Sequence, residues 1–195
     1  MTDVFENYLS STGSLLAEEI SFSVKFFKPI RLKKGDFFIN EEEICRHIGF
    51  IASGAVKAYA TDKEGKENIT CFKFENEFVT SFQEFVMQET SRRSIRAIED
   101  SVIYRITYTD YQHLLSKVTA WNDVIKSVME QEYYQKESYL LNYNNRSAVD
   151  KYRHVLSSEP MLVQRTATQD LASYLGITQR SLTRAKGQIH KPNIL

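Results

Sequence analysis

The sequence has few cysteines, prolines and glycines, and it contains no long apolar run. Only 2 Cys, 3 Pro and 7 Gly occur among its 195 residues. Cys45 and Cys71 are widely spaced, so they supply neither a disulfide framework nor a cluster site of four thiolates, and we expect small core or half-buried side chains. No segment has the roughly 18 consecutive apolar residues of a membrane helix. The start of the chain also lacks the features of a signal peptide, so we expect a cytoplasmic protein that contacts no membrane.

The four histidines are scattered along the chain. His47, His113, His154 and His190 form no HxH or HxxxH pair. A metal-dependent enzyme on a jelly-roll scaffold needs clustered histidines with a glutamate on adjacent strands. The sequence therefore predicts no catalytic residue, no metal and no cofactor.

The net charge of zero hides an asymmetry between the two parts of the chain. Residues 1–145 hold 17 Lys and Arg against 22 Asp and Glu, whereas residues 146–195 hold 8 against 3. Affinity for DNA comes largely from neutralising its phosphates. A basic C-terminal segment on an acidic body therefore has the charge distribution of a DNA-binding module attached to a separate regulatory domain.

Short strand-like segments fill the first half of the chain after a helical lead over residues 2–26. They alternate with turn residues, and no long helix separates them. These segments are residues 26–32, 37–39, 47–52, 55–61, 67–74, 92–98 and 101–108. Seven or eight such strands predict an antiparallel β-roll, a jelly-roll-like double-stranded β-helix; with the helices that follow, the fold class is α+β.

A long helical segment without proline or glycine spans about residues 120–144. At 1.5 Å per residue it is about 37 Å long, which is too long for a domain of this size without a partner. Residues spaced alternately four and three apart form a seam along one face of this helix. They are Trp121, Ile125, Val128, Glu132, Gln135 and Tyr139. We expect this seam to be the interface of a two-fold homodimer. The alternative is that Trp121, Val124 and Val128 pack only on the β-domain.

Residues 168–186, TQDLASYLGITQRSLTRAK, have the pattern of a helix-turn-helix. The first helix carries an apolar stripe that ends at Leu175, and Ala172 is small where two helices would cross most closely. Gly176 permits a sharp turn, because glycine adopts positive φ without steric cost. Thr178 can then cap the second helix through its hydroxyl.

The outward face of this motif is rich in hydrogen-bond donors for base edges and phosphates. The predicted DNA contacts are Thr168, Gln169, Thr178, Gln179, Arg180, Ser181, Thr183, Arg184 and Lys186. Double-stranded DNA is therefore the predicted partner. The alternatives are an ordinary helical hairpin with a solvated polar face, and a module that binds protein.

The chain divides into three parts at the ends of the long helix. Residues 1–117 form the β-roll domain, residues 118–146 the connecting and dimerisation helix, and residues 147–195 the helix-turn-helix domain. A short amphipathic helix is expected at the start of the last part, and Pro160 is expected to stop it. The stretch MLVQRTA, residues 161–167, then reads as an extended piece or a minimal wing.

The order of these parts resembles the Crp/Fnr family of bacterial transcription regulators over nearly the whole chain. The resemblance rests on GFIASGAVKAY at residues 49–59, SRRSIRAIEDS at 91–101, and LASYLGIT followed by SLTR within 171–184. It implies a cyclic-nucleotide-binding-like sensor domain and a homodimer that reads a palindromic site in successive major grooves. RNA polymerase and a small-molecule effector are further candidate partners.

The resemblance also indicates where an effector would bind. Cyclic-nucleotide-binding members hold the ribose with a Gly-Glu pair and the cyclic phosphate with an Arg-Ser pair. This chain has Phe82-Gln83 followed by Glu84 at the first place, and Arg93-Ser94 at the second. Phenylalanine in place of glycine would fill the pocket. We therefore expect a regulator that does not respond to cyclic AMP, with a pocket that is collapsed or takes another small molecule. The alternative is a regulator of the same fold that responds to a cyclic nucleotide.

Other expectations follow for the same domain. Phe85 and Ile95 should extend the apolar interior that Phe82 begins. The alternative to an anion site at Arg93 is a surface ion pair with Glu89 or Glu99. Fumarate-nitrate-type members carry four cysteine cluster ligands, which two cysteines cannot supply.

The DNA-reading helix departs from the family pattern in two ways. Arg180 stands where members often have a glutamate that accepts from cytosine, and arginine prefers guanine or a phosphate. Arg184 matches the later arginine of the family. The final residues, 187–195, do not form the hairpin that commonly follows the recognition helix, so we expect simpler and weaker DNA binding.

Overall fold

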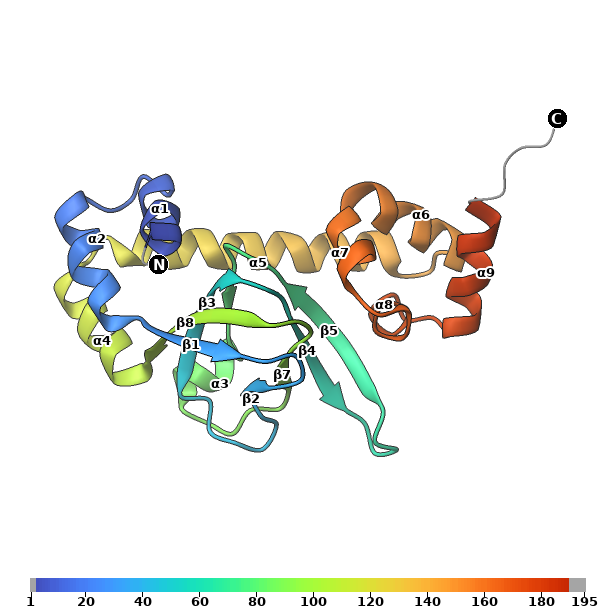
Figure 1. The fold of residues 1–195 in the computed structure, drawn as a ribbon, viewed down its shortest axis with the longest axis horizontal. Helices are drawn as coiled ribbons and strands as arrows, with labels where there is room; N and C mark the ends of the chain where they lie inside the picture. Colours follow the sequence, from blue (N-terminus) through green and yellow to red (C-terminus); the bar gives the residue numbers. More distant parts are fainter. Residues whose placement is uncertain (1–2, 190–195) are drawn as a thin grey trace.

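The computed structural model describes residues 3–189 and shows a β-roll with one long helix running along it to a cluster of short helices. The helical lead and α4 lie at one end of this long helix, and the helix-turn-helix lies at the other (Figure 1). The α+β fold predicted from the sequence is confirmed.

The helical lead covers one end of the roll. It comprises α1 (Asp3–Ser11), α2 (Ala17–Ser23) and a short 3₁₀ turn, η1 (Val24–Phe26). The ring of Phe5 is buried, with its centroid 4.5 Å from that of Phe27 and 4.7 Å from that of Phe50. Aromatic burial of this kind fixes the lead on the sheet, because each ring removes a large apolar area from water.

The roll consists of two four-stranded antiparallel sheets. The first has the order β1 (Lys28–Leu32), β8 (Ser101–Thr107), β3 (His47–Ser53) and β6 (Phe78–Val79). The second has the order β2 (Phe37–Ile39), β7 (Ser94–Ala97), β4 (Val56–Thr61) and β5 (Glu67–Lys73). Strands distant in sequence, such as β1 and β8, pair with each other, which is how a roll closes.

Two elements of the roll were not expected from the sequence. Strand β6 has only two residues, and helix α3 (Phe82–Met87) interrupts the strands where the resemblance placed the ribose-binding pair. Phe85 and Ile95 are fully buried, so the expected apolar interior is present.

Six helices follow the roll. They are α4 (Tyr108–Lys117), α5 (Trp121–Tyr143), α6 (Ala148–Ser158), α7 (Pro160–Arg165), α8 (Thr168–Tyr174) and α9 (Gln179–Ile189). The expectation of an extended piece over residues 161–167 is wrong, because most of that stretch is α7. Pro160 occupies the first turn of α7, where its missing N–H costs no hydrogen bond. The expected division at residues 117 and 146 falls in the loops flanking α5.

Gly54 makes the turn between β3 and β4 in a space that admits no side chain. Its φ is +91°, and an added Cβ would lie 2.6 Å from the carbonyl oxygen of Asp100 and 2.7 Å from the Cα of Ser101. Gly65, in the β4–β5 hairpin, also has a positive φ, but nothing lies within 4 Å of an added Cβ.

Gly54→Ala should therefore lower the free energy of unfolding by about 3 kcal/mol, from backbone strain plus overpacking. Gly65→Ala, the matched control, should cost about 1 kcal/mol from strain alone. Urea unfolding of both variants measures the difference. Equal losses would contradict the role assigned to the Asp100–Ser101 backbone.

Candidate nucleic-acid interface and effector cavity

Helices α8 and α9 meet at a tight corner built by buried apolar side chains. Leu171, Ala172 and Leu182 are each at most 2% exposed, so the two helices pack directly against one another. Gly176 has a φ of +62°, and the N–H of Ile177 donates to the carbonyl of Ala172 at 3.0 Å. The turn thus closes the C-terminus of α8 as the sequence pattern predicts.

The second helix begins with a side-chain cap. The hydroxyl of Thr178 accepts the N–H of Ser181 at 3.1 Å and lies 2.9 Å from the Ser181 hydroxyl. Both side chains are therefore occupied in shaping the helix start, where Thr and Ser are favoured caps.

Two arginines on the outward face of α9 have no side-chain partner within the described chain. Arg180 and Arg184 are exposed, and neither makes an ion pair or a side-chain hydrogen bond within residues 3–189. The other exposed members of the predicted set are Gln169, Thr178, Gln179 and Thr183.

Two predicted contacts are partly engaged inside the module. Lys186 is half-buried, with its ammonium 5.8 Å from the ring centroid of Tyr152 and its Nζ 3.4 Å from the Thr168 hydroxyl. Both groups therefore help to hold α9 against α8 and α6.

The helix-turn-helix is docked on the edge of the roll. Ser173 of α8 donates its hydroxyl to the carbonyl of Glu67 at 2.9 Å and accepts the N–H of Ile69 at 3.2 Å. The Lys57 ammonium, 5% exposed, binds the carboxylates of Glu67 at 2.6 Å and Asp170 at 2.9 Å. Strand β5 and helix α8 are thus joined by both backbone and charged contacts.

A second charged cluster joins α7 to two loops of the roll. The Arg165 guanidinium donates to both carboxylate oxygens of Glu75, at 2.7 and 2.9 Å, and also to Glu99. Glu75 in turn accepts the N–H of Gly54 at 2.9 Å. These hydrogen bonds, chiefly from Arg165, hold the pKa of Glu75 at about 2, although burial alone would raise it.

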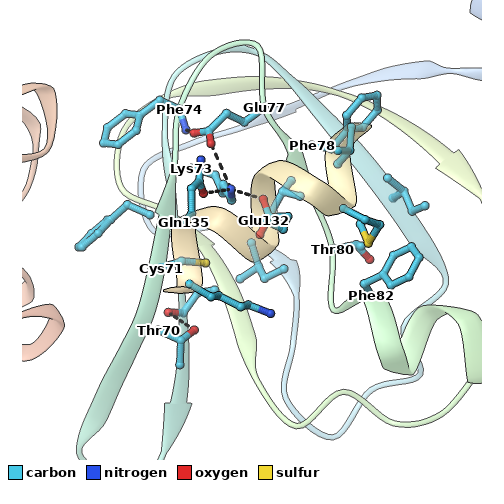
Figure 2. Close-up of a pocket in the computed structure, with 18 of the residues that line it drawn as sticks. Thr70, Cys71, Lys73, Phe74, Glu77, Phe78, Thr80, Phe82, Glu132 and Gln135 are labelled. Carbon is cyan, nitrogen blue, oxygen red and sulfur yellow. Dashed lines mark hydrogen bonds and ion pairs between the residues drawn. The ribbon is translucent and has the colours of Figure 1, made fainter. Parts of the chain in front are cut away.

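A large cavity of about 1210 Å³ lies between the roll and α5 and extends to α6 and α7. Its polar centre is shown in Figure 2, where the Lys73 ammonium points to carboxylate and amide oxygens. Lys73 binds Glu77 at 3.1 Å, Gln135 at 3.0 Å and also Glu132. Burial would lower the pKa of Lys73, but the two carboxylates outweigh it and raise the pKa.

Four of the five expected effector residues line the cavity, and one does not. Phe82, Gln83, Glu84 and Arg93 line the cavity, so the expectation of a collapsed pocket is wrong. Ser94 is buried and accepts the N–H of Glu41 at 3.0 Å; it is absent from the cavity wall.

Arg93 lines the cavity but is already occupied. Its guanidinium donates to the Ser81 hydroxyl at 3.0 Å and to the Thr80 carbonyl at 3.3 Å. The alternative of an ion pair with Glu89 or Glu99 is wrong, because within the described residues Arg93 contacts neither carboxylate.

Sequence reasoning overlooked Arg92, whose guanidinium binds Glu84 at 2.7 Å and Gln83 at 3.0 Å. The Ser81 hydroxyl also donates to Glu84. Burial alone would raise the pKa of Glu84, but these hydrogen bonds outweigh it and lower the pKa. Glu84 and Arg92, which both line the cavity, are therefore paired with each other.

The predicted dimer seam of α5 faces the chain's own body. Trp121 is 3% exposed, stacks on Phe27 and donates its indole N–H to Ser23 at 2.8 Å, so the prediction that it faces a partner is wrong. The Tyr139 hydroxyl donates to the carbonyl of Tyr174 at 2.7 Å. Ile125, Val128, Glu132 and Gln135 line the cavity. The alternative of packing on the β-domain is confirmed for Trp121 and Val124, both of which are buried.

Comparisons with known proteins agree with this architecture. Residues 29–118 match the family model of the cyclic nucleotide-binding domain. The fumarate and nitrate reduction regulatory protein of Vibrio cholerae is 25% identical over 86% of this chain and 70% of its own length. The regulatory protein HlyX of Actinobacillus pleuropneumoniae is 26% identical over 86% of this chain and 73% of its own.

A solved structure from Eubacterium rectale, of a protein assigned to the Crp/Fnr family, has the same fold. It superposes with a TM-score of 0.72 at 16% identity, over 94% of this chain and 88% of that one. Together these findings support a Crp/Fnr family transcription regulator. The chain is a DNA-binding transcription regulator, and its relatives are regulatory proteins.

Neither a cluster of metal-ligating side chains nor a membrane-spanning helix is found among the described residues. Within residues 3–189, no three side chains of His, Cys, Asp or Glu gather in a way that could hold a metal ion. The same residues contain no helix that is both long and apolar enough to cross a membrane. The expected absence of a C-terminal hairpin concerns residues 190–195, which lie outside the described chain.

The Arg165–Glu75 contact of this Crp/Fnr regulator should make its stability depend on pH. Because the folded-state pKa of Glu75 lies near 2, below its ordinary value of 4.5, the stabilisation is complete above about pH 5 and is lost as the pH falls toward 2. Arg165→Gln should reduce the difference between the unfolding midpoints at pH 6 and pH 3. Arg31→Gln, which changes an exposed arginine on β1, is the control and should leave that difference unchanged. A variant with the wild-type pH profile would contradict the assignment.

Proposed function

We propose that this regulator binds DNA as a homodimer, with one copy of α9 from each subunit in successive major grooves of a palindromic site. The observation that carries the proposal is the outward face of α9, where Arg180 and Arg184 have no intrachain partner. Unpaired arginines at this position suit guanine edges or phosphates. A two-fold dimer supplies two such helices and matches the symmetry of a palindrome.

The dimer contact is proposed to lie on the exposed face of α5. Tyr133, Tyr134, Leu140 and Leu141 are between 56% and 69% exposed. At about 100° per residue, Tyr133, Leu140 and Leu141 lie away from the seam that packs on the chain's own body. Tyr134 is also exposed and borders the large cavity. Positions 133 and 140, and likewise 134 and 141, are separated by seven residues, the repeat of a two-helix seam. Burying this face against a second copy would remove a large apolar patch from water.

The cavity supports a second proposal, a small-molecule effector other than a cyclic nucleotide. Its walls are largely apolar, and its volume of about 1210 Å³ exceeds what most small ligands need. The anion grip of the cyclic-nucleotide-binding members is not assembled, because Ser94 bonds to Glu41 and Arg93 bonds to Ser81 and Thr80. We also propose a cytoplasmic location and contact with RNA polymerase, because a transcription regulator acts at promoter DNA.

Arg184→Ala should weaken binding to a preferred duplex by about 1–3 kcal/mol and relax the preference at one base pair. Lys186→Ala should weaken all sequences alike and lower the salt dependence. Lys33→Ala, on an exposed loop of the roll, is the control and should change neither quantity. Fluorescence anisotropy on duplexes selected from a random pool measures these affinities. If the wild-type chain shows no salt-dependent binding at low salt, the proposal fails.

Leu140→Glu should dissociate the dimer, because it places a charge in the proposed apolar contact; we expect the dimer Kd to rise about tenfold or more. Met87→Glu alters an equally exposed apolar residue on α3 and should leave the dimer intact. Sedimentation equilibrium distinguishes the two variants. A dimer of Leu140→Glu with unchanged affinity would show that the subunits meet elsewhere.

A further inference from the structure

The roll carries two arginines that form no ion pair with the described residues. Arg105 on β8 stands directly opposite Lys28 on β1, and opposite Gly49 on β3. Like charges in cross-strand positions destabilise a sheet. Within residues 3–189, neither Arg105 nor the nearby Arg46 makes an ion pair or a side-chain hydrogen bond.

Arg46 and Arg105 border a concavity of about 430 Å³ that shares no residue with the large cavity. It is formed where the chain crosses from β2 to β3, and it is lined by Phe38, Ile39, Asn40, Glu43, Ile44, Arg46, His47 and Arg105. Strand β2 and the loop to β3 lie on the roll, well apart from α8 and α9 (Figure 1). The site is therefore separate from the DNA-binding surface.

Gly49 explains the shape of the apolar wall. A Cβ at this position would lie 2.5 Å from Ile103 and 2.7 Å from the ring of Phe38. The missing side chain thus lets the Phe38 ring pack onto the sheet beside Arg105. Ile44, exposed at 44%, extends the apolar surface at the same rim.

The charges that face the concavity are unequal. Two guanidinium groups, of Arg46 and Arg105, and the His47 imidazole oppose one carboxylate, that of Glu43. Glu43 accepts a hydrogen bond from Asn40 at 3.3 Å and is exposed. Burial first, then Arg105 and Arg46, lowers the pKa of His47, so the imidazole is largely neutral at pH 7 in the free protein.

We propose that this concavity binds a small ligand that carries an oxyanion group, with Arg46 and Arg105 holding the oxyanion and Phe38 supporting the apolar part of the ligand. Arginine forks match the geometry of phosphate, sulfate and carboxylate oxygens. Binding of the anion supplies the negative charge that the cluster lacks, and it favours a protonated His47 as a third donor.

Sulfate is a suitable probe, because its charge does not change between pH 6 and pH 8. Titration of the full-length protein at constant ionic strength, followed by amide NMR shifts, should show saturable binding with the shifts centred on residues 38–47 and 103–107. The double variant Arg46→Gln, Arg105→Gln should bind sulfate at least about tenfold more weakly. Arg31→Gln, an exposed arginine on the same sheet outside the concavity, is the matched control and should bind as the wild type does.

DNA affinity of the double variant should stay at the wild-type value, and its unfolding midpoint should not fall, because Arg105→Gln removes the like charge opposite Lys28. These two measurements separate loss of the site from loss of the fold or of DNA binding. Equal sulfate binding by the wild type and the double variant would overturn the proposal. Shifts centred on α9 or on the large cavity would overturn it as well.

The pH dependence tests the part assigned to His47. Sulfate affinity of the wild type should fall at least about threefold from pH 6 to pH 8, because protonation of His47 accompanies binding. His47→Gln should remove that dependence while leaving measurable binding at pH 8. A wild-type affinity that does not change with pH would show that the imidazole takes no part.

Discussion

The apolar contact between β5 and the C-terminal helices determines where the recognition helix lies. Phe72 of the roll packs edge-to-face on Tyr174 of α8, with centroids 5.5 Å apart, inside a core that also contains Leu171 and Leu182. A single apolar cluster therefore belongs to both the roll and the C-terminal helices. Two ion pairs fix the orientation of this contact, since each joins the roll to the C-terminal helices: Lys57 of β4 binds Asp170 of α8, and Arg165 of α7 binds Glu75 of the roll. Any ligand that moved β5 would move α8 with it.

Helix α5 performs two tasks on opposite faces. One face contacts the chain's own roll through Trp121 and the Lys73 partners, and it reaches the helix-turn-helix through Tyr139. The other face presents Tyr133 and Leu140 to solvent. Because the two faces belong to one continuous helix, a change in the cavity can alter how a second copy lies against the exposed face in the proposed dimer.

Local sequence signals were sufficient for the parts of the fold that depend on near neighbours. The turn at Gly176 and the cap at Thr178 follow from residues within one helical turn, and both are present. Local signals could not show which face of α5 packs on the chain's own roll. Glu132 and Gln135 fit a dimer seam by spacing, but their partner Lys73 lies on a strand far away in the sequence.

The effector residues show a similar limit. Arg93 and Ile95 line the cavity, whereas Ser94 lies between them and turns away, as the two-residue period of an extended chain requires. A motif of adjacent residues does not reveal which side chain enters the pocket, nor that Arg92 rather than Ser94 contacts Glu84. These facts depend on strand register and on the short helix α3, which no local pattern of residues predicts.

The attachment of α5 at both of its ends limits how this regulator can change over evolution. Trp121 and Val124 of its first turn are buried against the lead and the roll, and its last turns carry Tyr139 and Tyr143 into the helix-turn-helix core. Inserting one residue between these anchors would rotate the reading head by about 100° and break the docking on β5. The length of this segment is therefore fixed, and divergence within it must proceed by substitution.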